Sequence, residues 1–162
     1  MSGIQIHSQK NENILIYEFK GPIDEDAVFP QFDFADITDI VFNFDGVTVI
    51  NSCGIREWIR WIRGIPENLS MKFLKCPKVI VDQMNIVDGF LPARSQLESF
   101  YVPYFCEACN AVTEILFTAG VEFEHAQVNP PQNISCTNCS KISELDVIES
   151  KYFKFLQNLN KT

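Results

Sequence analysis

The sequence predicts an α/β fold, a mixed sheet with helices, that carries a small cysteine-bearing appendage. Over the first hundred residues, apolar runs typical of buried strands alternate with stretches of helical periodicity. Around residue 100 the composition changes to short strands, turns and two cysteine pairs. A chain of 162 residues with 46% hydrophobic residues is sufficient for one domain and an appendage. We therefore predict a domain over residues 1–100 and an appended element over residues 101–162.

The first elements are predicted to be strands over residues 3–8 and 13–20, and Gly21-Pro22 ends the second strand. An acidic loop, residues 24–26, follows. Residues 27–39 contain Pro30 and scattered aromatic side chains, which predict only a short and irregular helix.

The centre of the chain, residues 40–63, is predicted to be a strand followed by a helix. The apolar run 40–44 indicates a buried strand, Asp45-Gly46 breaks it, and residues 47–50 resume extended structure. Asn51-Ser52 stands where a helix cap belongs, and Gly64 stops the helix. The apolar residues with the spacing of one helix face are Ile55, Trp58, Ile59 and Ile62.

The segment Asn51-Ser52-Cys53-Gly54-Ile55 resembles the core motif of STAS domains, the fold of bacterial anti-anti-sigma factors. In that family a strand and a short gap precede Asp-Ser-Ser-Gly-Leu at the start of a helix. The resemblance implies that Ser52 occupies the position of the phosphorylatable serine. The family commonly has Asp where this chain has Asn43 and Asn51, which favours a constitutive scaffold over a phosphorylation switch.

The same resemblance implies a protein–protein interaction module in bacterial regulation, with an anti-sigma factor or a serine kinase as the partner. The acidic loop resembles the STAS loop after the second strand, where partner contacts often lie. The candidate partner-binding residues are Asp24, Asn51, Ser52, Arg56 and Arg60. Two simpler interpretations stay open: Ser52 is only a helix cap, and the arginines, with Arg63, form a solvated helix side.

The remaining elements complete the alternating pattern. Residues 70–75 predict a strand, residues 78–89 a short helix, and residues 95–105 another strand. Residues 142–159 have the apolar spacing of an amphipathic helix, or of two helical turns, that packs back on the body. Trp61 lies off both the apolar and the arginine faces, so it is either an exposed interface anchor or covered by the C-terminal segment.

Two C-x-x-C pairs, Cys106 with Cys109 and Cys136 with Cys139, give the strongest motif signal. Two such turns can complete a tetrahedron of thiolates with about 2.3 Å for each Zn–S bond. We therefore predict a zinc ribbon with one Zn²⁺ on these four cysteines. Four protein ligands leave no open coordination position, so the site is expected to be structural. Disulfides or a redox pair are the alternatives.

Cys53 and Cys76 belong to neither pair and are expected to be buried, unreactive thiols. No Ser/His/Asp set, phosphate-binding loop or paired-carboxylate motif is present, so we predict that the protein is not an enzyme.

The charge and the hydropathy pattern limit the partners. A net charge of −8 disfavours nucleic acid, because the phosphate backbone attracts basic surfaces. Since many zinc ribbons nevertheless bind nucleic acid, a nucleic-acid-binding zinc-ribbon protein is the alternative function. No apolar run approaches the roughly 20 residues that span a bilayer, and the N-terminus lacks an export signal. We expect a cytoplasmic protein without a membrane partner.

Overall fold

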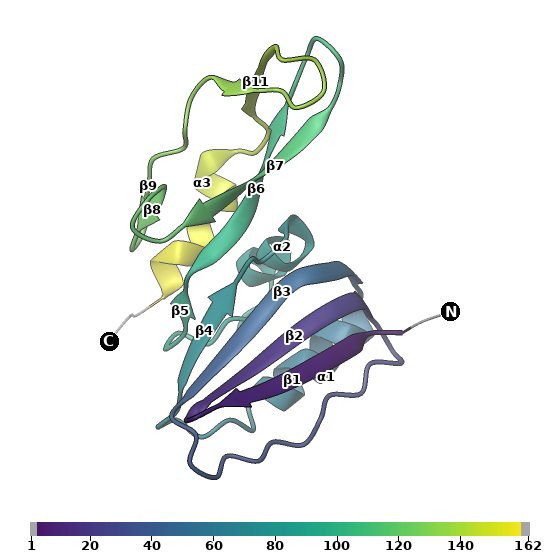
Figure 1. Cartoon of the computed structure of the whole chain (residues 1–162), viewed down its shortest axis with the longest axis vertical. Coiled ribbons are helices and arrows are strands. Elements are labelled where there is room, and N and C mark those ends of the chain that lie inside the picture. Colours follow the sequence, from purple (N-terminus) through teal and green to yellow (C-terminus); the bar gives the residue numbers. More distant parts are fainter. Residues whose placement is uncertain (1–2, 160–162) are drawn as a thin grey trace.

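Two sheets, joined end to end, form the framework of the molecule (Figure 1). The computed structural model describes residues 3–159 and confirms the predicted α/β class. In the five-stranded sheet, β1 runs antiparallel to β2, whereas β2 to β5 are parallel to one another. The strands, in spatial order, are β1 (Gln5–Asn11), β2 (Ile14–Ile23), β3 (Asp39–Ile50), β4 (Ser70–Leu74) and β5 (Gln96–Leu97).

Helices α1 (Ser52–Ile62) and α2 (Lys78–Ile86) follow β3 and β4, as the sequence predicts. The apolar face of α1 packs on the sheet through Trp58, whose ring centroid lies 5.4 Å from that of Phe42 and 5.3 Å from that of Phe44. The indole N–H of Trp58 donates to a backbone carbonyl of the loop after α2, so the buried ring has no unpaired donor.

The predicted break at Asp45-Gly46 is wrong, because β3 continues through it as one strand. The pairing of β2 with β3 shifts by one residue between Glu18 opposite Asn43 and Lys20 opposite Gly46. This shift is a β-bulge, which bends a strand without ending it. A Cβ at Gly46 would lie 2.9 Å from the Phe19 carbonyl oxygen, so the close approach of the strands requires glycine.

The predicted irregular helix over residues 27–39 is also wrong, because the chain from β2 to β3 contains no helix. It crosses α1 in an extended path instead. Trp61 holds this path: its ring stacks on Phe32 at 4.4 Å and on Phe29 at 4.9 Å between centroids. The Trp61 indole N–H donates to the Pro30 carbonyl oxygen at 2.7 Å. Trp61 is therefore half-buried under this connection, not under the C-terminal segment.

The second sheet carries the cysteine pairs and has the strand order β10-β11-β6-β7. Residues 95–105 supply two strands, since β5 belongs to the first sheet and β6 to the second. The C-terminal segment begins as a strand and then forms two short helical pieces, so only its later part agrees with the predicted helical turns. The elements are β6 (Ser99–Phe105), β7 (Val112–Thr118), β8 (Phe123–Glu124), β9 (Gln127–Val128), β10 (Ile134–Ser135), β11 (Ile142–Leu145), α3 (Glu149–Tyr152) and the 3-10 helix η1 (Lys154–Asn158).

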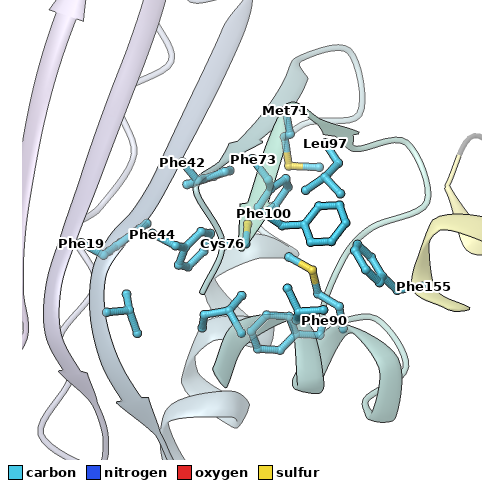
Figure 2. Close-up of a cluster of buried hydrophobic side chains, with 14 of the residues drawn as sticks. Phe19, Phe42, Phe44, Met71, Phe73, Cys76, Phe90, Leu97, Phe100 and Phe155 are labelled. Carbon is cyan, nitrogen blue, oxygen red and sulfur yellow. The ribbon is translucent and has the colours of Figure 1, made fainter. Parts of the chain in front are cut away.

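One apolar core runs from the first sheet to the C-terminal segment (Figure 2). A parallel bridge joins Cys76, just after β4, to Phe100 in β6, so the backbone also connects the two sheets. The Phe100 ring lies 5.3 Å from the Phe155 ring and 5.7 Å from the Phe117 ring. Asn85 adds a polar tie: its side chain donates to the Tyr152 carbonyl at 2.9 Å and accepts from the Phe155 amide at 2.8 Å.

Within residues 3–159, no helix is both long enough and apolar enough to cross a membrane.

Candidate functional site

The first cysteine pair lies in the turn between β6 and β7. The Cys106 amide donates to the Ala111 carbonyl at 2.9 Å, and the Asn110 amide donates back to the Cys106 carbonyl at 2.7 Å. Asn110 has a φ of 63°, a left-handed conformation that asparagine tolerates better than most residues. These bonds fold the chain tightly enough to point Cys106 and Cys109 toward the same side.

The second pair repeats this turn between β10 and β11. The Cys136 amide donates to the Lys141 carbonyl at 2.6 Å, and the Ser140 amide donates to the Cys136 carbonyl at 2.9 Å. Ser140 takes the left-handed place of Asn110, with a φ of 65°. The two turns lie together at the outer end of the four-stranded sheet, at the top of Figure 1.

All four Sγ atoms lie within 4.8 Å of one another, so the four predicted ligands form one cluster that could hold a metal ion. Across the turns, Cys106 Sγ is 3.5 Å from Cys139 Sγ, and Cys109 Sγ is 3.6 Å from Cys136 Sγ. A tetrahedral ion with bonds of about 2.3 Å needs sulfur atoms roughly 3.8 Å apart. Cys106 and Cys136 are buried, and Cys109 and Cys139 are partly exposed. The donor set therefore fits a four-coordinate metal.

Hydrogen bonds within the cluster favour the thiolate form that a metal requires. Contact with Asn138 lowers the pKa of Cys109 to about 6. Backbone amides of Cys139 and Asn138 likewise lower the pKa of Cys136. Although the Lys141 amide lowers the pKa of Cys139, desolvation and the other thiols raise it to about 12. A metal cation bound among the four thiols would lower the pKa of Cys139 as well, because a cation stabilises every thiolate.

A second group of predicted residues lies at the start of α1. The Asn51 Oδ1 accepts a hydrogen bond from the Gly54 amide at 2.9 Å, so Asn51 is the helix cap. Ser52 is the first residue of the helix, and its side chain is exposed. The interpretation of Ser52 as the cap therefore fails. The Asn51 Nδ2 also donates to Glu25 Oε2 at 2.8 Å. A backbone hydrogen bond, and after it this bond from Asn51, lowers the pKa of Glu25.

Gly54 explains why the helix begins so close to the end of β2. A Cβ at this position would lie 2.1 Å from the Ile23 carbonyl oxygen, well inside any permitted contact. The same carbonyl accepts the Asn51 amide at 3.2 Å. Glycine thus lets the end of β2, the acidic loop and the start of α1 meet at one place.

Asp24 lies in that acidic loop, where its carboxylate accepts the Asp26 amide at 3.0 Å. Arg56 and Arg60 follow Ser52 along α1, with side chains 66% and 71% exposed. Both approach Glu57, Arg60 at 3.2 Å and Arg56 at 3.8 Å. Both arginine side chains are therefore largely solvated. Glu25 belongs to the predicted acidic loop, but its contact with Asn51 has no local signal in the sequence, so sequence reasoning missed that contact.

Of the two remaining cysteines, Cys76 is buried, and burial raises the pKa of its thiol. This confirms the expected burial of Cys76, and the raised pKa disfavours the reactive thiolate form. Cys53 is partly exposed instead, because it follows Ser52 on the first turn of α1.

The fold and the site define a class: an α/β protein with a four-cysteine cluster at the end of a second sheet. Neither a protein-family model nor a curated protein matches the sequence, so the functional assignment depends on the geometry.

Proposed function

We propose that this chain is a non-enzymatic protein–protein interaction module of the STAS type, cytoplasmic and acting in bacterial regulation, with a structural zinc ion. The resemblance that the motif suggests is supported by position. The motif directly follows β3, its first residue caps α1 and its second residue begins that helix, and an acidic loop follows the second strand. The proposed partner is a regulatory protein, such as an anti-sigma factor or a serine kinase.

The exposure of Ser52 is the observation that carries this proposal. Since Asn51 provides the cap, the Ser52 hydroxyl has no structural task at the helix start and faces solvent. The hydrogen bond from Asn51 to Glu25 places the acidic loop beside it. We define the docking face as Asp24, Asn51, Ser52, Arg56 and Arg60, which carry both signs of charge. Such a face favours a partner with complementary charges.

The same surroundings favour a fixed interaction over a phosphorylation switch. A phosphate on Ser52 would add about −1.5 to −2 charges beside the carboxylates of residues 24–26. The helix N-terminus compensates by only about 0.3–1 kcal/mol at an exposed position. Like-charge repulsion would also strain the bond between Asn51 and Glu25. The expected role is a constitutive scaffold.

Affinity capture from the native cells tests the proposal, with wild-type, Ser52→Asp and Arg56→Glu proteins as baits and Lys154→Glu as the matched charge control. We expect wild type and Ser52→Asp to capture the same partner, and Arg56→Glu to lose it. If only Ser52→Asp loses the partner, the protein is a phosphorylation switch and not a constitutive scaffold. Capture that none of the docking-face changes affects would overturn the assignment of this face.

The metal is proposed to be zinc because of its ligands. Four thiolates in a tetrahedron are typical of structural zinc, and hard ions such as Mg²⁺ prefer oxygen ligands. When bound, the ion would neutralise the thiolates of Cys106, Cys109, Cys136 and Cys139 and tie the two turns together. The free thiols also agree with a reducing compartment.

A further inference from the structure

A groove of about 320 Å³ lies between α2 and the segment that contains α3. Residues 78–86 form one wall, and residues 146–152 form the other. The groove belongs neither to the cysteine cluster nor to the docking face, and its lining is largely apolar.

Two isoleucines in this groove are unusually exposed. Ile86 on α2 is 75% exposed, and Ile148 just before α3 is 62% exposed. Burying one such side chain contributes about 1.5–3 kcal/mol. Because Ile86 and Ile148 line the same groove, an occupant of the groove would bury both of them together.

Two lysines and two aspartates line the groove. Among the described residues, one lysine and one aspartate of this set form no ion pair. Lys78 is already engaged, since its Nζ lies 2.8 Å from Asp82 Oδ2 and 5.9 Å from the centre of the Tyr152 ring. Lys151 and Asp146 are exposed, and neither forms an ion pair within residues 3–159. Burial raises the pKa of Glu114, and Lys78 lowers it. The negative charge of Asp146 also raises this pKa, because like charges repel.

We propose that this groove is the interface of a two-fold symmetric dimer of this chain. Ile86 and Ile148 of one copy pack against the same residues of the other, and Lys151 of each copy meets Asp146 of its partner. A two-fold axis places a surface against itself, so that surface must be self-complementary. Lys151 and Asp146, which form no ion pair among the described residues, lie beside the two exposed isoleucines and meet this condition.

The overall charge opposes self-association, and it is the local balance of charge at the groove that supports a second copy as the occupant. At −8, two chains repel each other over most of their surfaces, and they approach best where the local charge cancels. Lys78 and Lys151 balance Asp82 and Asp146 at the groove. A strongly basic partner would find more attraction at the acidic loop, and an acidic partner would find no excess of positive charge here. Standard interfaces bury about 800 Å² on each partner, and this groove is small, so we expect a reversible dimer with a dissociation constant on the order of micromolar.

Sedimentation velocity of the zinc-loaded chain, over a series of concentrations, tests the dimer. We expect wild type to pass from monomer to dimer as concentration rises. Lys151→Glu or Asp146→Lys alone should raise the dissociation constant by at least roughly tenfold, because each places like charges together. The double variant K151E/D146K should restore dimerisation.

Lys154→Glu is the matched control, since it makes the same charge change on an exposed lysine that does not line the groove. It should dimerise as wild type does, and circular dichroism should show that all variants are folded. Wild type that stays monomeric at every concentration, or a dimer that Lys151→Glu leaves intact, overturns the proposal. So does failure of the double variant to recover. None of these results bears on the docking face, because no other protein is present.

Discussion

The five-stranded sheet and the cysteine tip (residues 105–112 and 134–143) are held together by different interactions. In the sheet, Phe19, Phe42 and Phe44 are buried against Trp58. At the tip, the exposed fractions of Val112 and Ile142 are 54% and 58%, and the buried residues are two cysteines and Ser143.

The difference indicates where a metal ion on the four cysteines would be needed. An aromatic core orders the sheet without help, because each large buried ring contributes both area and specific packing. The tip buries too little apolar surface to offset the entropy of ordering its turns. A metal ion held by the cysteine cluster would supply the missing stabilisation there.

Removal of the metal should have the largest effect, and it should be confined to the tip. Structural zinc contributes about 10–16 kcal/mol of apparent binding free energy in small zinc domains. We expect wild type to contain one zinc by elemental analysis and Cys106→Ser to contain none. Hydrogen exchange should then accelerate over the tip.

Cys53→Ser is the control, because Cys53 is a free thiol outside the cluster. It should keep one zinc and the wild-type exchange rates. A tip that stays protected in Cys106→Ser without metal contradicts the comparison.

Gly54→Ala should be the most damaging single change in the five-stranded region. In an exposed helix this substitution is normally favourable by up to about 1 kcal/mol. Here the new Cβ would clash with the Ile23 carbonyl, so we expect a loss of about 3 kcal/mol or more in the free energy of unfolding by urea. Gly64→Ala, where the nearest atom is 3.3 Å away, should change it much less. If both substitutions change the free energy of unfolding equally, Gly54 does not lie against the Ile23 carbonyl.

Asn85→Ala should weaken the connection between the sheets. It removes two hydrogen bonds and leaves the Tyr152 carbonyl and the Phe155 amide without their partner. We expect a loss of about 2 kcal/mol, from roughly 1 kcal/mol for each bond, with faster proteolysis of residues 149–158. Asn68→Ala, on an exposed loop, is the control. Unchanged stability and proteolysis in Asn85→Ala would show that Phe100 alone joins the two parts.

Asn51→Ala and Ser52→Ala should give the smallest and most informative difference. Loss of the cap costs about 1 kcal/mol, whereas an exposed first-turn serine contributes almost nothing. Thermal or urea unfolding of the pair distinguishes them. If Ser52→Ala lowers the free energy of unfolding more than Asn51→Ala does, Ser52 is the helix cap. Its hydroxyl would then have a structural role and would not be free for a partner.

The elements that sequence predicts well are those with a local signal. Helix α1 follows from the periodicity of Ile55, Trp58 and Ile62, and Gly64 marks its end within two residues. The four cysteines follow from the C-x-x-C spacing alone, because a tight turn fixes where both thiols point. In these cases the information lies within a few residues.

The misses have the opposite origin, since each depends on residues far apart in the chain. The connection between β2 and β3 is extended because Phe29 and Phe32 stack on the ring of Trp61. Trp61 lies about thirty residues away in the sequence. Asn51 competes with Ser52 for the cap, and a contact with Glu25 helps to fix it. Asp45-Gly46 bends β3 instead of breaking it because β2 pairs on both sides of the bulge.

The tie at Asn85 has a consequence for synthesis on the ribosome. A chain emerges from its amino end, so Asn85 of α2 leaves the ribosome 67 to 70 residues before Tyr152 and Phe155, and Phe100 leaves it about fifty residues before them. Until then Phe100 has no cover from the C-terminal side, and the Asn85 amide has no partner there. The nascent chain therefore carries an apolar surface of the kind that holding chaperones bind, and residues 152–155 close it last.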